Sequence, residues 1–133
     1  MRKFLLDTNI CIYYIKGKFD LKKYFEEADP ENCFISEITL AELKFGVENS
    51  ENKEKNQNTL DSFLTAIKII PIYHSLDFYA KEKARLRKSG TPIDDFDLLI
   101  GVTSVTHNLI MVTSNTEHFK RIKGITLEDW TKK

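Results

Sequence analysis

The sequence is short of the features that mark several classes of protein. No apolar stretch approaches the length needed to span a bilayer, and Asp7 interrupts the first apolar run too early for a secretory signal peptide. The spacing of the two cysteines, Cys11 and Cys33, fits no metal-binding or redox motif. These gaps predict a cytoplasmic protein without a membrane segment, in which both thiols are buried as small apolar groups.

An excess of charge of either sign is also missing. Lys and Arg together number 20, and so do Asp and Glu. This balance argues against a protein that holds nucleic acid by bulk positive charge. It does not exclude a nuclease, because an acidic metal site beside a basic strip also sums to zero. The length of 133 residues and the 41% hydrophobic content fit a single domain over residues 1–133.

Short apolar runs alternate with segments of helical periodicity along the chain. Strands are expected near residues 3–6, 33–35, 67–72, 109–113 and 125–127. Helical segments are expected around residues 12–15, 38–45, 60–67, 76–88, 96–105 and 116–121. Strands separated by helices imply right-handed crossovers, so the sequence predicts an α/β fold with a mostly parallel central sheet.

Four side chains with oxygen ligands follow the expected strands. Asp7 comes directly after the first strand, and Glu42 lies one turn into the helix after the second. Asp97 opens a later helix, and Asn115 lies just past the 109–113 strand. Ligand sites in parallel sheets lie beyond the carboxyl ends of the strands, so we expect these side chains to converge there. Gathered carboxylates repel one another, and a divalent ion such as Mg²⁺ or Mn²⁺ relieves that repulsion.

Each of these residues also has a structural interpretation. Asp7 could cap the helix that follows it, and Thr39–Glu42 fits a capping box, which would make Glu42 a reciprocal cap. Asp97 could favour the helix dipole. Ser114–Glu117 is again a capping-box pattern, and for Asn115 this interpretation is favoured. Convergence of all four at one sheet edge is therefore the stronger argument for a site.

Four blocks of the sequence, in order and spacing, resemble the motifs of VapC-type PIN domains, the ribonuclease toxins of bacterial toxin–antitoxin pairs. The blocks are Phe4-Leu5-Leu6-Asp7-Thr8-Asn9-Ile10, Ser36–Leu43 with Gly46, Gly90-Thr91-Pro92-Ile93 with Asp97-Leu98-Leu99-Ile100, and Val112-Thr113-Ser114-Asn115 with the residues up to Trp130. The resemblance covers nearly the whole chain and implies a three-layer α/β/α PIN-like fold.

The resemblance also implies site residues and departures from the usual pattern. Asp7, Glu42 and Asp97 match the acids that hold metal in the family. Asn115 stands where many PIN domains have a fourth acid and where VapC relatives often carry Asn, which leaves open whether one or two metal ions bind. The family more often has Gly at Asp94, and small alanines where this chain has residues 101–104.

The implied activity is that of a metal-dependent endoribonuclease, the toxin of a VapBC-type pair. Mg²⁺ or Mn²⁺ on the acids would activate a water that cleaves structured RNA such as tRNA. A VapB-like antitoxin and a homodimer are implied as partners. The alternative of a catalytically weak or inactive PIN-like module that binds RNA or protein stays open because of Asn115. A receiver-like phosphoryl-transfer domain fits poorly, because the late strand ends in residues 113–115 without a lysine.

Cations near the acids are candidates for RNA contacts. Lys120, Arg121 and Lys123 follow Asn115 closely, and Arg85 lies on the expected 76–88 helix. A solvated charged surface is the competing interpretation, and the cluster after Asn115 is favoured over the helix.

Three further groups have weaker or no predicted roles. The apolar run of residues 12–15 could form a groove for an antitoxin helix or pack in the core. Thr8 and Thr113 could orient water or phosphate, but a structural role at strand ends is favoured. His118 and the other two histidines receive no role.

Overall fold

The computed structural model describes residues 2–132. Its centre is a five-stranded sheet in the order β3-β2-β1-β4-β5, and all the strand pairs in this sheet are parallel. The strands are β1 (Phe4–Leu6), β2 (Cys33–Ser36), β3 (Lys68–Ile70), β4 (Ile110–Val112) and β5 (Leu127–Glu128). The expected parallel sheet is confirmed, with β1 in the middle.

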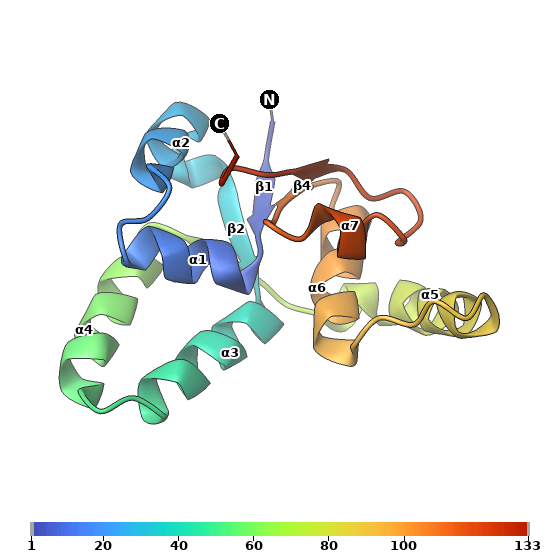
Figure 1. The fold of residues 1–133 in the computed structure, drawn as a ribbon, viewed down its shortest axis with the longest axis horizontal. Coiled ribbons are helices and arrows are strands. Elements are labelled where there is room, and N and C mark those ends of the chain that lie inside the picture. The colour runs from blue at the N-terminus through green and yellow to red at the C-terminus, as the bar shows by residue number, and fades with distance from the viewer. Residues whose placement is uncertain (1, 133) are drawn as a thin grey trace.

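Helices connect the strands and cover both faces of the sheet (Figure 1). They are α1 (Thr8–Ile15), α2 (Leu21–Ala28), α3 (Glu37–Glu48), α4 (Lys53–Leu64), α5 (Leu76–Lys88), α6 (Asp95–Thr106) and α7 (Thr116–Phe119), with short 3₁₀ turns η1 (Pro30–Asn32) and η2 (Tyr73–Ser75). Among these elements of the described residues, α2 and the two 3₁₀ turns have no counterpart among the expected elements. Helix α2 follows two residues with positive φ, Phe19 and Asp20, and the side chain of Asp20 at its N-cap makes no capping hydrogen bond.

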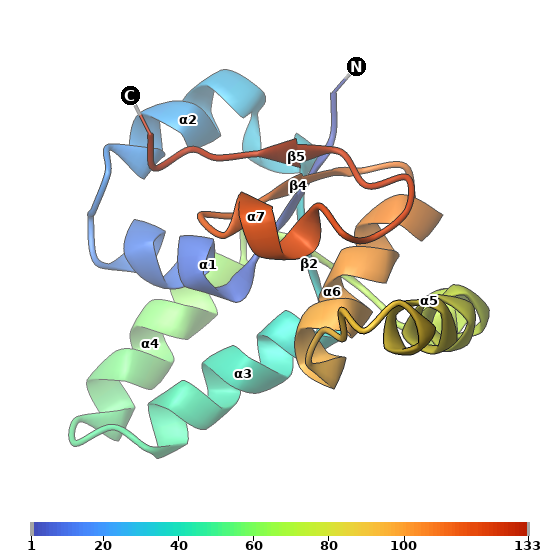
Figure 2. The ribbon, with the colours of Figure 1, turned by 45° about the vertical axis from the view of Figure 1, so that its right-hand side comes forward.

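Alternate residues of each strand divide the core into two parts, as the pleat requires. Phe4 and Leu6 of β1 pack with α1, α2, α3 and α4 on one face. Leu5 packs on the other face with residues of α5, α6 and α7. In Figure 2 the sheet lies between these two groups of helices. The expected three-layer α/β/α arrangement is confirmed.

Cys11 and Cys33 are both free and fully buried in the first core. Burial raises the pKa of Cys33 to about 12 and raises that of Cys11 further still. Both side chains therefore stay protonated and act as small apolar groups, as expected.

No helix within residues 2–132 combines the length and the apolar character needed to cross a membrane.

Candidate active site

The carboxyl ends of β1, β2 and β4 meet at one edge of the sheet, and the first turns of α1 and α3 lie beside it (Figure 1). Asp7 extends β1 by one residue, because its backbone N–H donates to the Val112 carbonyl at 2.9 Å. Thr113 follows β4 directly, so its side chain lies at the same edge as Asp7. The topology therefore brings together residues that are 106 positions apart in the sequence.

Asp7 is the most buried acid of this edge, with 6% of its surface exposed. Its Oδ1 accepts from the Thr8 backbone N–H at 2.8 Å, which caps α1, and its Oδ2 accepts from the Thr113 hydroxyl at 2.8 Å. Burial nevertheless raises the pKa of Asp7 from 3.8 to about 6, and the nearby charges of Asp97 and Glu42 add to the increase. Asp7 is thus both a helix cap and an acid that a bound cation would stabilise.

Glu42 faces the same edge from the second turn of α3. Its Oε1 accepts from the Thr8 hydroxyl at 2.7 Å, and the Thr39 hydroxyl lies 3.1 Å from the same Thr8 oxygen. The expected Thr39–Glu42 capping box is wrong, because α3 begins earlier, at Glu37. The N-cap is the buried Ser36, whose Oγ accepts from the Thr39 N–H at 3.1 Å. Glu42 lies outside the first helical turn, and its carboxylate points toward Thr8 instead of a cap.

Asp97 is the third residue of α6 and is half-buried. Its charge raises the pKa of Asp7, which shows that the two carboxylates lie near each other although they come from different elements. Its Oδ2 is 3.2 Å from Nε2 of His118 on α7. Helix α6 therefore brings Asp97 between the end of β1 and α7.

Asn115 is the N-cap residue of α7, but its side chain makes no capping hydrogen bond. The Ser114–Glu117 capping-box interpretation is therefore wrong for Asn115. Its backbone N–H donates to Thr113 Oγ1 at 3.0 Å, which links it to the hydroxyl that holds Asp7. The Asn115 side chain is exposed at this edge and adds an amide without a negative charge.

The four candidate cations lie in two different situations. Lys120 forms an ion pair with Glu117, and Lys123 is exposed. The guanidinium of Arg121 contacts backbone carbonyls and His118, and that of Arg85 binds Glu82 with two hydrogen bonds of 2.7 and 2.8 Å. Lys120 and Lys123 both face solvent, and Lys120 is paired with Glu117. Both arginines have partners within the protein, although Arg85 is also exposed.

Within residues 2–132, no three His, Cys, Asp or Glu side chains lie close enough together to form a ready-made metal cluster. Each acid is turned toward a donor of its own: Asp7 toward Thr113, Glu42 toward Thr8 and Asp97 toward His118. The donor set nonetheless fits a hard divalent ion, because it consists of carboxylate oxygens supplemented by an amide and hydroxyls. Burial is the main cause of the raised pKa of Asp7, and the charges of Asp97 and Glu42 add to it, so a cation bound here would stabilise the ionised carboxylate.

The sequence interpretation did not predict the contacts of two kinds of residue at this edge. Thr8 and Thr113 were assigned to strand-end structure, but their hydroxyls donate to the carboxylates of Glu42 and Asp7. His118 was given no role, although its ring lies 3.2 Å from Asp97. The threonines were named as possible water or phosphate ligands because of their positions, with a structural role favoured, but no local pattern marks the histidine.

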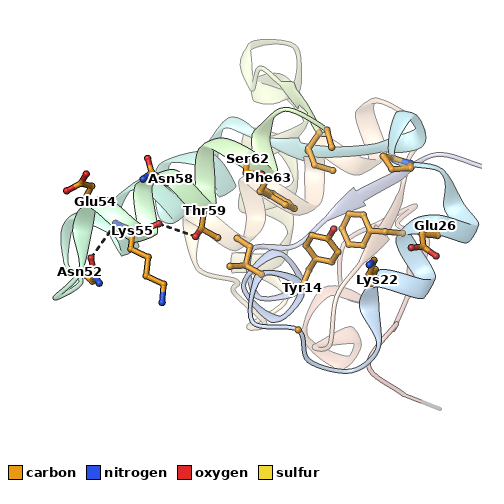
Figure 3. Close-up of a pocket in the computed structure, with 16 residues that line it drawn as sticks. Tyr14, Lys22, Glu26, Asn52, Glu54, Lys55, Asn58, Thr59, Ser62 and Phe63 are labelled. Carbon is orange, nitrogen blue, oxygen red and sulfur yellow. Dashed lines mark hydrogen bonds between the residues drawn. The ribbon is translucent and has the colours of Figure 1, made fainter.

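A separate open pocket of about 1020 Å³ lies between α1, α2 and α4 (Figure 3). Tyr14 of α1 and Phe63 of α4 point toward each other there, with ring centroids 5.8 Å apart. A smaller pocket of about 360 Å³ on the other side of α1 is lined by Ile12, Ile15 and Glu42. Residues 12–15 pack on the core as expected, and Ile12, Tyr14 and Ile15 also border these two pockets. The antitoxin groove stays a prediction.

Comparison with known proteins assigns the chain to a family. The PIN domain family model matches residues 4–125. Ribonuclease VapC2 of Rickettsia felis is 40% identical over 134 residues, which cover 97% of this chain and 98% of the relative. The tRNA(fMet)-specific endonuclease VapC of Shigella flexneri is 35% identical and covers 98% of this chain and 100% of its own length.

Solved structures agree with these sequence matches. The toxin in the crystal structure of DNA-bound VapBC from Salmonella typhimurium superimposes with a TM-score of 0.91 at 33% identity, over 98% of this chain and 99% of that one. VapBC2 from Rickettsia felis, bound to a DNA fragment from its promoter, gives a TM-score of 0.89 at 37% identity, over 96% and 98% of the two chains. With fold, motif order and sequence in agreement, the chain belongs to the PIN domain family and, within it, to the VapC ribonucleases.

Proposed function

We propose that this chain is a metal-dependent endoribonuclease that acts as the toxin of a VapBC-type pair. The observation that carries the proposal is the buried Asp7, whose pKa is raised to about 6 at a sheet edge that it shares with Glu42 and Asp97. Capping of α1 by Asp7 does not require Glu42 and Asp97 at the same edge, and such perturbed groups are typical of functional sites. The ribonuclease names of full-length relatives support the same activity.

Asp7, Asp97 and Glu42 are the residues that would hold Mg²⁺ or Mn²⁺. When bound, such an ion supplies a water of lowered pKa as the nucleophile and offsets negative charge on the phosphate under attack. The protein's own contribution is orientation. The Thr8 N–H and the Thr113 hydroxyl each hold one oxygen of Asp7, and the Thr8 hydroxyl holds Oε1 of Glu42. Each carboxylate oxygen has a further lone pair, so both acids can still bind an ion.

RNA is the substrate class that this proposal adopts, with structured RNA such as tRNA as the first choice. Support comes from the name of the Shigella flexneri relative, a tRNA(fMet)-specific endonuclease. Lys123 is exposed beyond the Asn115 edge and is available for phosphate contacts. Lys120 is exposed too, but it would have to give up its ion pair with Glu117 for such a contact. Such a substrate would place the activity in the cytoplasm.

A VapB-like antitoxin is the proposed protein partner, because two of the similar structures are VapBC complexes. The pocket between α1, α2 and α4 offers an apolar floor in Tyr14 and Phe63, with Lys22 and Glu26 among the residues that line it (Figure 3). An amphipathic helix with apolar side chains at one face suits such a surface. The smaller pocket also borders α1 and extends to Glu42, so a partner bound in both pockets would also cover the proposed site.

A homodimer is the proposed assembly. Phe45, Tyr73 and Phe96 have exposed fractions of 67%, 75% and 54%. Large aromatic side chains at this exposure favour burial against another protein surface. The mass of the purified toxin in solution, measured by light scattering, tests this part: a monomer at micromolar concentration would contradict it.

The experiment that tests the activity uses the purified protein, freed of any partner, with total tRNA and Mg²⁺ or Mn²⁺. We expect discrete fragments that disappear with EDTA and with the Asp97→Asn variant. Asp61→Asn is the matched control, because Asp61 is an exposed acid on α4 that contacts only Gln57. Loss of cleavage in this control as well would indicate that the effect is not specific to the site.

A negative result would still separate the candidate functions. Metal binding without tRNA cleavage would contradict tRNA as the substrate and direct the search to other RNAs. No cleavage together with no metal binding would overturn the enzyme and favour the inactive binding module.

A further inference from the structure

Arg121 is held at the carboxyl end of α7 by contacts to three backbone carbonyls. Its Nε donates to the His118 carbonyl at 3.1 Å, and Nη1 donates to the carbonyls of Thr91 and Pro92 at 3.1 and 3.0 Å. The loop that contains Thr91 and Pro92 leads directly into α6, which carries Asp97. Arg121 therefore joins α7 to the segment that positions Asp97, and this use of the planar guanidinium differs from a phosphate contact.

The remaining contact of Arg121 fixes the protonation pattern of a neighbouring ring. Nη2 lies 2.7 Å from Nδ1 of His118. A guanidinium has only donors, so Nδ1 must be the acceptor and carries no proton. The proton of the neutral ring is then on Nε2, an assignment that follows from the partner and not from a visible hydrogen.

The Nε2 atom of His118 lies 3.2 Å from Asp97 Oδ2 and has no other nearby partner among the described residues. The atom is buried, and in this orientation the N–H is not aligned well enough to count as a hydrogen bond. Hydrogen bonds in active sites are often long or poorly aligned before the ligands bind, and they tighten in the complex. Within residues 2–132, the Asp97 carboxylate is the group placed to accept a hydrogen bond from this buried donor.

Helix α5 holds the segment around Arg121 in place. The buried Glu82 binds Arg85 and also accepts from the Lys123 backbone N–H at 3.0 Å. Arg85 in turn donates to the Arg121 carbonyl at 2.8 Å. The His118 ring is thus oriented by a network that reaches from α5 through Arg121, and this network leaves it little rotational freedom.

We propose that His118 is a positioning residue for Asp97: Nε2–H holds Oδ2, Arg121 fixes the tautomer, and the other Asp97 oxygen is left for the metal ion. The proposal rests on the proposed metal-dependent function. Because Nε2 carries the proton, His118 has no lone pair facing the site and is not itself a metal ligand. Groups that orient a ligand in this way typically contribute about 10- to 100-fold to metal affinity.

The first test measures Mn²⁺ affinity of the whole protein by isothermal titration, without RNA. His118→Gln keeps an amide donor near the position of Nε2, whereas His118→Asn keeps an acceptor for Arg121 but is too short to reach Asp97. We expect about 10-fold or greater weakening in His118→Asn and less than about 3-fold in His118→Gln. Equal affinity of both variants and the wild type, or equal weakening of both, would overturn the proposal.

The second test reads the tautomer in the metal-free protein from the ¹⁵N chemical shifts of the His118 ring. The wild type should show a protonated Nε2 and an unprotonated Nδ1, and Arg121→Met should give a mixture of tautomers. Arg87→Met removes the same charge from an exposed position on α5 and should leave the ring unchanged. A protonated Nδ1 in the wild type would overturn the proposal.

The two tests also separate this inference from the proposed function. If the wild type binds Mn²⁺ and His118→Asn binds it equally well, the metal site stands and the role of His118 fails. If the wild type binds no Mn²⁺, the proposed function fails. The ring ¹⁵N chemical shifts of the wild type and Asp97→Asn then test the contact between His118 and Asp97. Identical chemical shifts in the two proteins would overturn the contact, and a changed chemical shift at Nε2 would support it.

Discussion

At the scale of single residues, Asp7 shows a conflict between folding and function. Its carboxylate is almost fully buried, and burial raises its pKa from 3.8 to about 6 in spite of two hydrogen bonds. A shift of this size corresponds to about 3 kcal/mol of destabilisation when the group is ionised without a counterion. The residue that is expected to bind metal therefore destabilises the metal-free fold at neutral pH.

Replacing Asp7 by Asn should make the metal-free protein more stable and inactive. The amide removes the charge, can still accept from Thr8 and can donate to the Thr113 oxygen. We expect the melting temperature in EDTA at pH 7.5 to rise by about 5 °C, as about 1 to 2 kcal/mol would produce. Calorimetry of the two proteins checks this, with Asp61→Asn as the unchanged control. A lower melting temperature for Asp7→Asn would contradict the conclusion that the buried charge of Asp7 destabilises the metal-free fold.

The pH dependence of stability should carry the same signature. The folded pKa of Asp7, about 6, lies above the unfolded value of 3.8, so the folded state binds this proton more tightly. The resulting stabilisation is present below about pH 4 and is lost as the pH rises through about 6. Urea unfolding in EDTA between these limits should show the advantage of Asp7→Asn over the wild type growing with pH. A constant difference would refute the raised pKa.

At the scale of elements, hydrophobic periodicity was sufficient where the helix ends carry clear signals. The expected helix at 76–88 has the observed bounds of α5, which ends before a glycine with positive φ, Gly90. The start of α3 was misplaced, because Ser36 closes β2 and caps α3 at the same time, and the Thr39 pattern masked it. Helix α2 was missed because Leu21 and Phe25 provide only two buried positions in eight residues.

The site was predictable in part for a related reason. Asp7 follows β1 and Asp97 lies in the first turn of α6, so topology brings both to one edge. Glu42 reaches the same edge from the second turn of α3. The contacts of Arg121 and His118 depend on how α7 packs against the loop before α6, and charge pattern along the chain does not encode that packing. The basic cluster in the sequence therefore did not reveal that Arg121 binds backbone carbonyls whereas Lys123 is exposed to solvent.

Helix α6 offers a test of close packing between elements. A Cβ added at Gly101 would lie 2.3 Å from Cδ1 of the buried Ile122, in the segment after α7. We expect Gly101→Ala to lower the free energy of unfolding by about 1 to 2 kcal/mol, because overpacking outweighs the better helix propensity of alanine. The same change in an Ile122→Val background, which lacks Cδ1, should be neutral or stabilising. Urea unfolding of the four proteins measures this, and equal effects in both backgrounds would contradict it.

At the scale of the whole molecule, the charge balance predicts weak salt dependence of RNA binding. The net charge is zero, and several cations are paired with acids, among them Lys120, Lys83 and Arg85. Each phosphate contact contributes about −0.7 to the slope of log K against log salt for a single strand, so we expect a slope between about −1 and −3. Fluorescence anisotropy with the Asp97→Asn variant gives this slope. A slope steeper than about −5 would contradict this expectation.

The central position of β1 has a consequence for the moment at which activity arises during synthesis. β1 is made first, yet its neighbour β4 and the hydroxyl of Thr113 are made more than a hundred residues later. Asp97 also comes from the last third of the chain. While the segments with Asp97 and Thr113 have not yet left the ribosome, Asp7 lacks its contacts to them. Contacts between residues so far apart in the sequence also form late in folding. A growing toxin would thus remain harmless to the ribosome that makes it until translation has passed Thr113.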